Sequence, residues 1–398
     1  MDQWKAKLIE VGETYPWYTG LLGGRQAEEF GSLQELPLIT SAVLEAHYYH
    51  QTPDPALAVY RTSGTSSGRR KAIFYSEEDD RRYVEIKTRL FGKLLEGSGC
   101  RRALADMGTG HAASTATAIF DRLGLDNRSI SFELPIERHI EALTAFRPDL
   151  LYTMPSILDH IVYASGDPRA FGIRKIILVG EIAPPQWQRN MAQLFGLDSR
   201  DVIDTYGSIE IGTIAYYSHD IGRYLLVDNM IAEGIGTKEL GEALEPLGAD
   251  ESVLVLTSLV RSMLPALRFV TYDVVRDLRP VIVDGVEKMS FQSIVKRVGR
   301  ELKHGEKISV YDIEQVVYRH LEDAMVRVKM HNNALVVAIQ SKSATEEAAR
   351  IIQKELGECI PEIGLMIQNR LLGNIRVTLL PEGERMENGQ VKNKKLYY

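Results

Sequence analysis

"AVYRTSGTSSGRRKAIFY", residues 58–75, sets two short apolar and aromatic segments on either side of a loop of hydroxyls, glycines and positive charge. Short runs of aromatic and apolar residues are typical of strands, so we predict strands at 56–60 and 72–75. The loop between them ends on Arg69, Arg70 and Lys71. The stretch therefore predicts strand, loop and strand, and its function depends on what the loop holds.

Three interpretations of this loop are open from its residues. Glycine, serine and threonine are common in turns, so one interpretation is a flexible surface turn. A Gly-x-Ser-x-Gly pattern centred on Ser66 would make a serine hydrolase, but that pattern runs from a strand into a helix, and here a predicted strand follows. Backbone N–H groups freed by glycine, hydroxyl donors and Lys71 together suit a polyphosphate. The loop is not a Walker A motif, because Gly64 and Gly68 are too close and Ala72 follows the lysine.

Beyond the loop, strands and helices alternate as far as about residue 207. "RKIILVG" (174–180) predicts a buried strand, "PPQWQRNMAQLFG" (184–196) a helix, and "DVIDTYG" (201–207) the next strand. Such alternation is typical of a helix-covered, mostly parallel sheet. From 224 to 277 the pattern becomes β-rich. The fold class that we predict is α/β, with mixed or parallel sheets and a β-rich subdomain in a large N-terminal domain.

The last hundred residues predict a smaller α+β unit. "YDIEQVVYRHL" (311–321) has the pattern of a helix, and "MVRVKM" (325–330) and "ALVVAIQ" (334–340) have that of strands. The stretch before them, "KRVGRELKHGE" (296–306), is charged and contains glycine, as domain linkers often do. The predicted domains are therefore 1–300 and 301–398.

Composition limits the classes of function. The 398 residues are 44% hydrophobic and carry a net charge of −7, which disfavours a general nucleic-acid-binding surface. The two cysteines, Cys100 and Cys359, fit neither a disulfide framework nor a zinc site. The first residues lack the apolar core of a signal peptide, and no apolar run approaches the length of a membrane span. We expect a cytoplasmic protein with neither nucleic acid nor membrane as partner.

"TSGTSSGRRK" (62–71) resembles the phosphate-binding loop of the adenylate-forming enzymes, which include acyl-CoA synthetases, aryl-acid and amino-acid adenylating domains, and luciferases. Three further segments resemble motifs of that family and follow in its order. They are "VGEIAPPQ" (179–186), "DTYGSIEIG" (204–212) and "PALRFVTYDVVRD" (265–277). The resemblance covers about residues 56–398. It implies a large ATP-binding domain followed by a small, mobile C-terminal domain.

The resemblance also implies that the protein takes ATP and Mg²⁺ and releases AMP. Lys71 would act on the phosphates as a catalytic residue, and Glu210 would hold the metal, since a hard cation prefers carboxylate oxygens. Tyr206 would stack near adenine, and Ser208 would approach the α-phosphate or the substrate carboxylate. The residues implied to bind the nucleotide are Thr62, Ser63, Gly64, Thr65, Ser66, Ser67, Gly68, Gly180, Glu181, Ile182, Tyr206, Gly207, Ser208, Arg268 and Asp273.

Two positions depart from the family pattern. Asp273 would accept the ribose hydroxyls with Arg268 in the same layer, but Tyr272 stands where the family has glycine, which alone adopts positive φ freely. Near the C-terminus Gln390 stands where the family has a catalytic lysine. We expect Lys392 to take that role in a shifted register, with Lys394 and Lys395 as alternatives. A nucleotide-binding module without catalysis stays open on this ground.

The resemblance leans toward aryl acids as substrates, because the loop spacing and "HGEK" (304–307) match aryl-acid-activating enzymes best. A slot lined by glycine suits a flat ring, and the expected substrate-binding residues are Gly108, Thr109, Gly110 and His111. The implied reaction is adenylation of a hydroxybenzoate and transfer to the pantetheine of a carrier protein, as in siderophore biosynthesis, with coenzyme A as the alternative acceptor. A 3,4-dihydroxybenzoate–AMP ligase of the petrobactin type is one specific form. The compact N-terminus resembles that of the phenylacetate–coenzyme A ligase branch. Amino-acid substrates stay open, because amino-acid-activating members carry an aspartate for the substrate ammonium in this region, where Asp106 stands.

Overall fold

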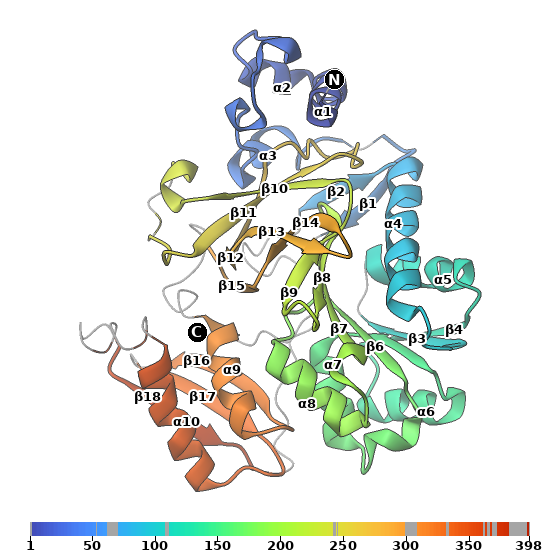
Figure 1. The fold of residues 1–398 in the computed structure, drawn as a ribbon, viewed down its shortest axis with the longest axis vertical. Helices are drawn as coiled ribbons and strands as arrows, with labels where there is room; N and C mark the ends of the chain where they lie inside the picture. Colours follow the sequence, from blue (N-terminus) through green and yellow to red (C-terminus); the bar gives the residue numbers. More distant parts are fainter. Residues whose placement is uncertain are drawn as a thin grey trace. The chain divides into compact units, whose positions relative to one another are not determined.

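The computed structural model divides the chain into two compact units (Figure 1). Unit 1 comprises Met1–Phe91, Gly207–Tyr216 and Gly222–Glu301, and unit 2 comprises Gly92–Tyr206, Tyr217–Ile221 and Leu302–Tyr398. The predicted boundary near residue 300 lies outside the described residues and stays a prediction. The structure describes residues 2–52, 54–61, 71–107, 111–241, 244, 246–298, 309–331, 334–360, 363, 367, 372–381 and 396–397.

A parallel sheet forms the centre of unit 2, in the strand order β4-β3-β5-β6-β7. All four residues of β5 are buried, as expected of a parallel strand covered on both faces. The sequence prediction of an α/β fold is therefore confirmed. The strands are β3 (Arg102–Met107), β4 (Asp126–Ser131), β5 (Leu150–Thr153), β6 (Lys175–Val179) and β7 (Val202–Ser208). The connecting helices are α5 (His111–Arg122), α6 (Ile136–Phe146), α7 (Pro155–Ala164) and α8 (Pro185–Phe195), with 3₁₀ turns at Pro168–Phe171 and Ser199–Asp201.

Local signals in the sequence explain where these helices begin and end. Pro155 and Pro185 occupy the first turns of α7 and α8, where a missing N–H costs no helical hydrogen bond. Gly196 ends α8 with φ of 69°, a left-handed conformation that glycine adopts without strain. The motif segment predicted at 179–186 begins at the last residue of β6 and leads into α8, and the one at 204–212 runs from within β7 to the first residue of the strand Gly212–Ser218.

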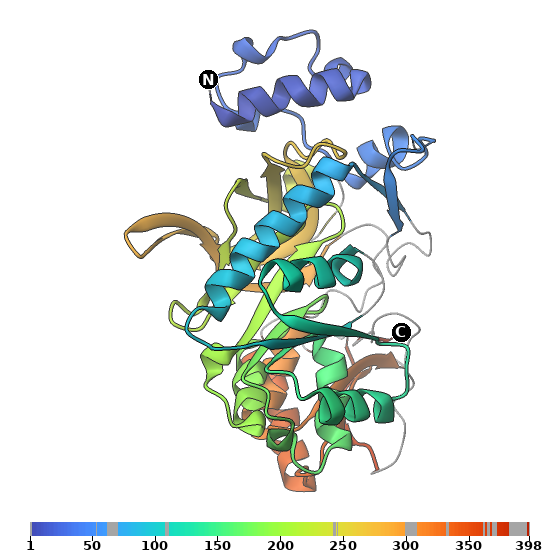
Figure 2. The same cartoon turned by 90° about the vertical axis from the view of Figure 1, so that its right-hand side faces the viewer.

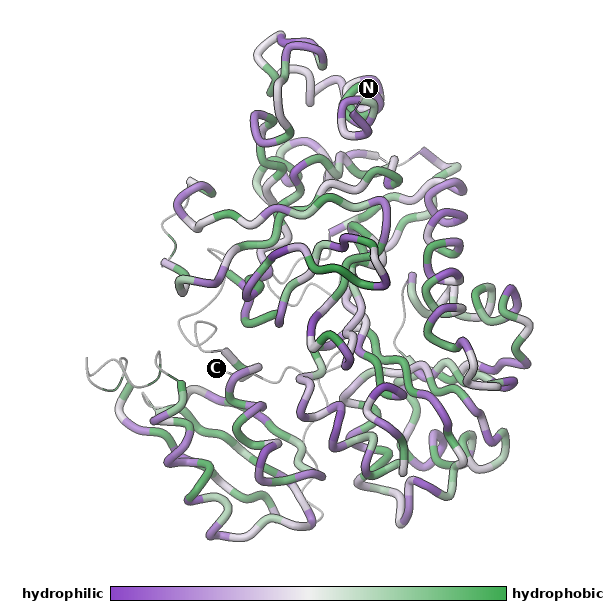
Figure 3. The backbone as a smooth tube through the Cα atoms, in the orientation of Figure 1, coloured by the Kyte–Doolittle hydropathy of each residue, from purple (hydrophilic) through white to green (hydrophobic). Residues whose placement is uncertain are grey.

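The two strands predicted on either side of the loop are confirmed in unit 1, although the first begins at Ala58 and ends at Arg61 rather than spanning 56–60. β1 (Ala58–Arg61) pairs antiparallel with β2 (Ala72–Tyr75), and Arg61 lies opposite Ala72. Residues 62–70, which include the predicted nucleotide-binding loop from Thr62 to Gly68, lie outside the described residues. α4 (Glu77–Leu95) follows, with polar and apolar residues alternating along it (Figure 3). The element after the loop, β2, is a strand, whereas the nucleophile turn of a serine hydrolase leads into a helix.

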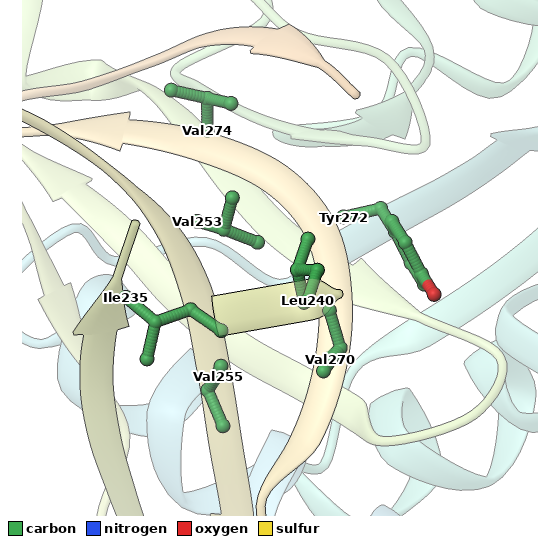
Figure 4. Packing of buried hydrophobic residues seen from close by; sticks show 7 residues of the cluster. All are labelled: Ile235, Leu240, Val253, Val255, Val270, Tyr272 and Val274. Atoms are coloured by element: carbon green, nitrogen blue, oxygen red, sulfur yellow. The ribbon is translucent and has the colours of Figure 1, made fainter. Parts of the chain in front are cut away.

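An antiparallel sheet of order β10-β11-β12-β15 carries an apolar core in unit 1. Figure 4 shows this core, in which valines of β11 and β12 pack with Ile235, Leu240 and Tyr272. In a second set of antiparallel strands, β9 pairs with β14, and β14 pairs with β13. The hairpin of β13 and β14 projects outward in Figure 2. The strands are β8 (Gly212–Ser218), β9 (Arg223–Leu226), β10 (Met230–Ile235), β11 (Glu251–Ser258), β12 (Phe269–Arg276), β13 (Arg279–Val283), β14 (Val286–Phe291) and β15 (Ser293–Arg297). The N-terminal helices are α1 (Gln3–Thr14), α2 (Pro16–Leu21) and α3 (Ser41–His47), and 3₁₀ turns span Ala27–Glu29, Leu33–Glu35 and Thr237–Leu240.

The C-terminal part of unit 2 is the α+β element that the sequence predicts. Its sheet has the order β18-β17-β16-β19, and α9 and α10 lie side by side over it (Figure 1). Its elements are α9 (Val310–His320), β16 (Met325–His331), β17 (Ala334–Gln340), α10 (Glu346–Cys359), β18 (Asn374–Leu379) and β19 (Leu396–Tyr397). Across the described part of the chain, no helix has both the length and the apolar character of a membrane span.

Candidate active site

Lys71, the residue that ends the predicted phosphate loop, lies beside an aromatic ring. Its Nζ is 5.0 Å from the centroid of Tyr49. Burial raises the pKa of the Tyr49 phenol well above its ordinary value, and the negative charge of Glu210 adds to this effect. Tyr49 therefore contacts the predicted phosphate lysine through its ring, and its phenol feels the charge of the predicted metal carboxylate.

The turn from Ser208 to Ile211 presents Glu210. Oγ of Ser208 accepts a hydrogen bond of 3.2 Å from the backbone N–H of Ile211, which closes the turn. The hydroxyl of Tyr75 donates to the carbonyl of Ile209 at 2.8 Å, and Nε of Arg261 donates to the carbonyl of Glu210 at 3.1 Å. The backbone of the turn is therefore held by groups from two other segments.

Glu210 itself fits the role of a metal ligand. Its side chain is half-buried, and no residue in the described ranges forms a hydrogen bond or an ion pair with its carboxylate. A half-buried carboxylate without a protein partner is what a hard cation such as Mg²⁺ can use, with phosphate oxygens and waters as its other ligands. Among the described residues no group of three or more histidine, cysteine or acidic side chains could hold a metal alone. A site shared between Glu210 and a bound phosphate is consistent with both observations.

Gly207 is required by the close approach of two strands. A methyl group at Gly207 would lie 2.6 Å from the carbonyl oxygen of Gly212, a contact that side chains do not make. We expect Gly207→Ala to lower the free energy of unfolding by about 1–3 kcal/mol, because the backbone must move apart. Urea unfolding measures this. Gly20→Ala is the matched control, since a methyl at Gly20 meets nothing within 4 Å; equal losses in the two variants would contradict the steric argument.

The predicted ribose segment retains its turn despite Tyr272. Tyr272 has φ of 62°, the left-handed conformation that the family pattern assigns to glycine. A bulky residue there costs about 1–3 kcal/mol of strain. The ring packs into the apolar core of Figure 4, and its hydroxyl accepts a hydrogen bond of 3.2 Å from the N–H of Ser41. Packing therefore holds the conformation that glycine would adopt freely.

Asp273 and Arg268, on either side of this turn, differ in how accessible they are to a ligand. The carboxylate of Asp273 lies 3.8 Å from Nε of Arg297 and is 21% exposed, so it can still meet a ligand. The Arg268 guanidinium is buried and donates to the carbonyls of Gln34 and Leu36, both at 2.7 Å, and its Nε lies 3.2 Å from Glu233. Arg268 thus ties the N-terminal segment to β12, and its predicted place beside the ribose stays a prediction.

In unit 2 the two remaining nucleotide motifs lie side by side. Val179 of β6 is the register partner of Thr205 of β7, so Gly180 and Tyr206 follow on adjacent strands. Gly180 turns the chain with φ of 85°. The N–H of Ala183 donates to Asp204 at 3.3 Å, which fastens the segment after β6 to β7.

Glu181 has a clear local partner. Its carboxylate accepts hydrogen bonds from the N–H and the hydroxyl of Ser156, at 2.8 and 2.9 Å, and so lies at the N-terminal end of α7. A negative charge at this end is favourable because of the helix dipole. The contact of Glu181 and Ile182 with adenine stays a prediction, and the Glu181 carboxylate is already used by Ser156.

Only the last residue of the predicted acid-binding segment, His111, is among the described residues. Gly108, Thr109 and Gly110 lie outside the described residues, whereas His111 is buried and begins α5, where its carbonyl accepts from the hydroxyl of Thr115 at 2.7 Å. Lys392, Gln390, Lys394 and Lys395 also lie outside the described residues.

Asp106 is the partner of a buried histidine. Its Oδ2 lies 2.8 Å from Nδ1 of His139, and Nε2 of His139 lies 3.1 Å from the carbonyl oxygen of Leu134. Both partners are acceptors, so they favour a histidine that donates from both nitrogens, and the carboxylate raises the pKa of His139 against the effect of burial. Asp106 is fully buried, so it is not presented as a free anion to an amino-acid substrate.

Sequence reasoning missed Arg261, Asp79 and Tyr49. The signal for Arg261 is a single cation inside the apolar run "SLVRSML" (258–264), which predicts a buried charge that needs a partner. Asp79 stands in the acidic first turn of α4, and nothing in that run distinguishes it from the neighbouring acids. Nothing in the sequence indicates that these two residues pair.

The chain is similar to a known ligase over nearly its whole length. A family model for the C-terminal domain of fumarate–diaminopropanoate ligase matches residues 303–380. Over 369 residues the chain is 39% identical to the fumarate–(S)-2,3-diaminopropanoate ligase of Enterobacter agglomerans, which covers 92% of each chain. The hydrolase and non-catalytic alternatives are thereby set aside, because a ligase is similar over nearly the whole chain.

Solved structures support the fold. 2-Hydroxyisobutyryl-CoA ligase in the postadenylation state superposes with a TM-score of 0.73 at 16% identity, covering 99% of this chain and 88% of that chain. ATP-bound MatB from Rhodopseudomonas palustris superposes with a TM-score of 0.52 at 10% identity, covering 84% of this chain and 65% of that chain. With a relative 39% identical over 92% of both chains, the chain belongs to the family of fumarate–diaminopropanoate ligase, and its fold is that of 2-hydroxyisobutyryl-CoA ligase.

Proposed function

We propose that this protein joins fumarate, or a closely similar unsaturated dicarboxylic acid, to an amino group of 2,3-diaminopropanoate at the expense of ATP. The observation that carries the proposal is the 39% identity to a ligase of that name over 92% of both chains. The match of the C-terminal family model supports it, because it covers residues 303–380 of the small domain.

The chemistry proceeds in two steps. A carboxylate is a poor electrophile, so one of its oxygens first attacks the α-phosphorus of ATP, and the bond from that phosphorus to pyrophosphate breaks. The neutral amine of the acceptor then attacks the acyl carbon; a C–N bond forms, AMP leaves and the amine loses a proton. The first step needs no general base, because its nucleophile is already ionised, so positioning and charge neutralisation carry it.

The residues of this chain would divide these tasks. The loop from Thr62 to Gly68 and Lys71 would hold the β- and γ-phosphates, and Asp273 would hold the ribose. Mg²⁺ bound through Glu210 would neutralise charge on the departing pyrophosphate. Lys392 would contact the reacting carboxylate in the place of the family lysine.

A hydroxybenzoate activated for a carrier protein is the alternative that the loop pattern favours. Its support comes from "HGEK", the spacing of the loop and the glycines at 108 and 110, whereas the relative at 39% identity is named for an aliphatic dicarboxylate and an amine. Coenzyme A as acceptor has support only from proteins that share the fold at 16–17% identity. These alternatives differ from the proposal in both acid and acceptor.

A matrix of acids and acceptors tests the proposal. Purified protein with MgATP is given fumarate, maleate, succinate or 3,4-dihydroxybenzoate, each with 2,3-diaminopropanoate, alanine or coenzyme A. Pyrophosphate release and product mass are measured. We expect the amide of fumarate and 2,3-diaminopropanoate to dominate, with succinate as the control of equal charge that lacks the double bond. Turnover with the benzoate alone, or a thioester as the main product, would contradict the proposal.

A further inference from the structure

We propose that Arg261 is a positioning residue that fixes Glu210 relative to the strand leaving the phosphate loop. The inference rests on the proposed function, because it takes Glu210 as the ligand of a nucleotide-bound cation. Arg261 lies between β11 and β12 and is 3% exposed, so its charge is removed from water. A buried guanidinium needs a partner at each donor, and the identity of those partners shows what the residue connects.

Each nitrogen of the Arg261 guanidinium reaches a different segment of unit 1. Nη1 donates to the carboxylate of Asp79, in the first turn of α4, at 2.5 Å. Nη2 donates to the carbonyl of Phe74 in β2 at 2.5 Å. Nε donates to the carbonyl of Glu210 at 3.1 Å. Because the guanidinium is planar and rigid, these three bonds fix the angles between the segments as well as their distances.

Tyr75 adds a second connection between the same two segments. The centroid of its ring lies 3.6 Å from the guanidinium carbon of Arg261, a close cation–π contact. Its hydroxyl donates to the carbonyl of Ile209 at 2.8 Å. Neighbouring residues of β2 thus hold neighbouring residues of the turn. We call Arg261, Asp79 and Tyr75 the arginine clamp.

The clamp connects two parts that must act on one ligand. β2 begins at Ala72, directly after Lys71, so its position sets where the phosphate loop ends. The turn held on the other side carries the carboxylate of Glu210. The backbone of Arg261 is itself fixed, since Nζ of Lys7 donates to its carbonyl at 2.7 Å. If Glu210 holds the cation of a bound nucleotide, the spacing between the turn and β2 must be kept to a fraction of an ångström.

The test compares nucleotide affinity with and without metal. The ligand is an ATP analogue with a methylene group between the α- and β-phosphorus atoms, and calorimetry measures its dissociation constant with Mg²⁺ and with chelator. Arg261→Lys keeps the charge that Asp79 needs but cannot bridge three acceptors. We expect it to reduce the Mg²⁺-dependent gain in affinity by about tenfold, the effect of one hydrogen bond to a charged group, with metal-free affinity unchanged.

Arg223→Lys is the matched control. Arg223 is also buried in unit 1, with Nη1 2.7 Å from Asp277 and Nε donating to Ser290 at 2.9 Å, but it does not contact the Glu210 turn. We expect this variant to keep the full Mg²⁺-dependent gain. Three results would each overturn the inference. They are an equal loss of the Mg²⁺-dependent gain in both variants, an equal loss of nucleotide affinity with and without metal, and no Mg²⁺-dependent gain in the unaltered protein.

Tyr75→Phe provides the same test with a smaller change. It removes the hydroxyl that donates to Ile209 and keeps the ring under the guanidinium, so it serves where Arg261→Lys does not fold. We expect a reduction of the Mg²⁺-dependent gain by about threefold to tenfold, and an unchanged gain would count against the clamp. Failure of the fumarate assay leaves this binding test intact, so the two proposals fail separately.

Discussion

Glu210→Gln is expected to lower the rate of acyl-adenylate formation by about 10²–10³-fold, the usual cost of removing one group that stabilises developing charge. Glutamine keeps the size of the side chain and loses the negative charge that a hard cation requires. The fold should be unchanged, because no residue in the described ranges uses the Glu210 carboxylate as a hydrogen-bond or ion-pair partner. Pyrophosphate release with saturating fumarate and ATP, over a range of Mg²⁺ concentrations, measures the effect.

Glu287→Gln is the control for this experiment. Glu287 is exposed on the β13–β14 hairpin in unit 1 (Figure 2), and it loses the same charge without a predicted role. We expect its rate to match that of the unaltered protein. If Glu210→Gln retained a rate within threefold of that control, the role of Glu210 as metal ligand would be wrong.

Asp79→Asn is expected to lower the free energy of unfolding by about 3–5 kcal/mol, because it leaves the buried Arg261 charge without its counterion. The Asp79 side chain is fully buried, and besides Arg261 it accepts from the N–H groups of Ser262 at 2.7 Å and Met263 at 2.9 Å. Asparagine cannot neutralise the guanidinium, and its amide group places a donor where these bonds need acceptors. Urea denaturation followed by circular dichroism gives the difference.

Asp80→Asn separates this effect from that of the helix dipole. Asp80 stands in the same first turn of α4 and is only partly buried, so its charge contributes equally to the dipole interaction. We expect it to cost less than about 1 kcal/mol. A loss below that value for Asp79→Asn as well would show that the Arg261–Asp79 pair adds nothing to stability.

The parts of the fold that the sequence predicted are those that local patterns specify. Short apolar runs gave β1 and β2, and alternating strands and helices gave the parallel sheet of unit 2. Since parallel neighbours bring the ends of their strands together, the segments at 179–186 and 204–212 could be expected to meet, and the register of Val179 with Thr205 confirms this.

The arginine clamp could not be predicted, because Asp79 and Arg261 are 182 positions apart and neither has a local pattern that names its partner. Tyr272 shows the opposite case, in which the sequence indicated a problem that the structure solves. Tyrosine is unfavourable at positive φ, but a hydrogen bond from the distant Ser41 to its hydroxyl helps to hold this conformation. The acid substrate stays a proposal for another reason. A phosphate loop recognises what all adenylate-forming enzymes share, so its spacing carries little information about the acid.

Oxygen transfer from the acid to AMP tests the central claim most directly. Fumarate labelled with ¹⁸O in its carboxylates is turned over with ATP and 2,3-diaminopropanoate, and the nucleotide and phosphate products are analysed by mass spectrometry. The account predicts one ¹⁸O atom in the phosphate group of AMP, with unlabelled pyrophosphate. Label in inorganic phosphate, with ADP as the nucleotide product, would contradict attack at the α-phosphorus.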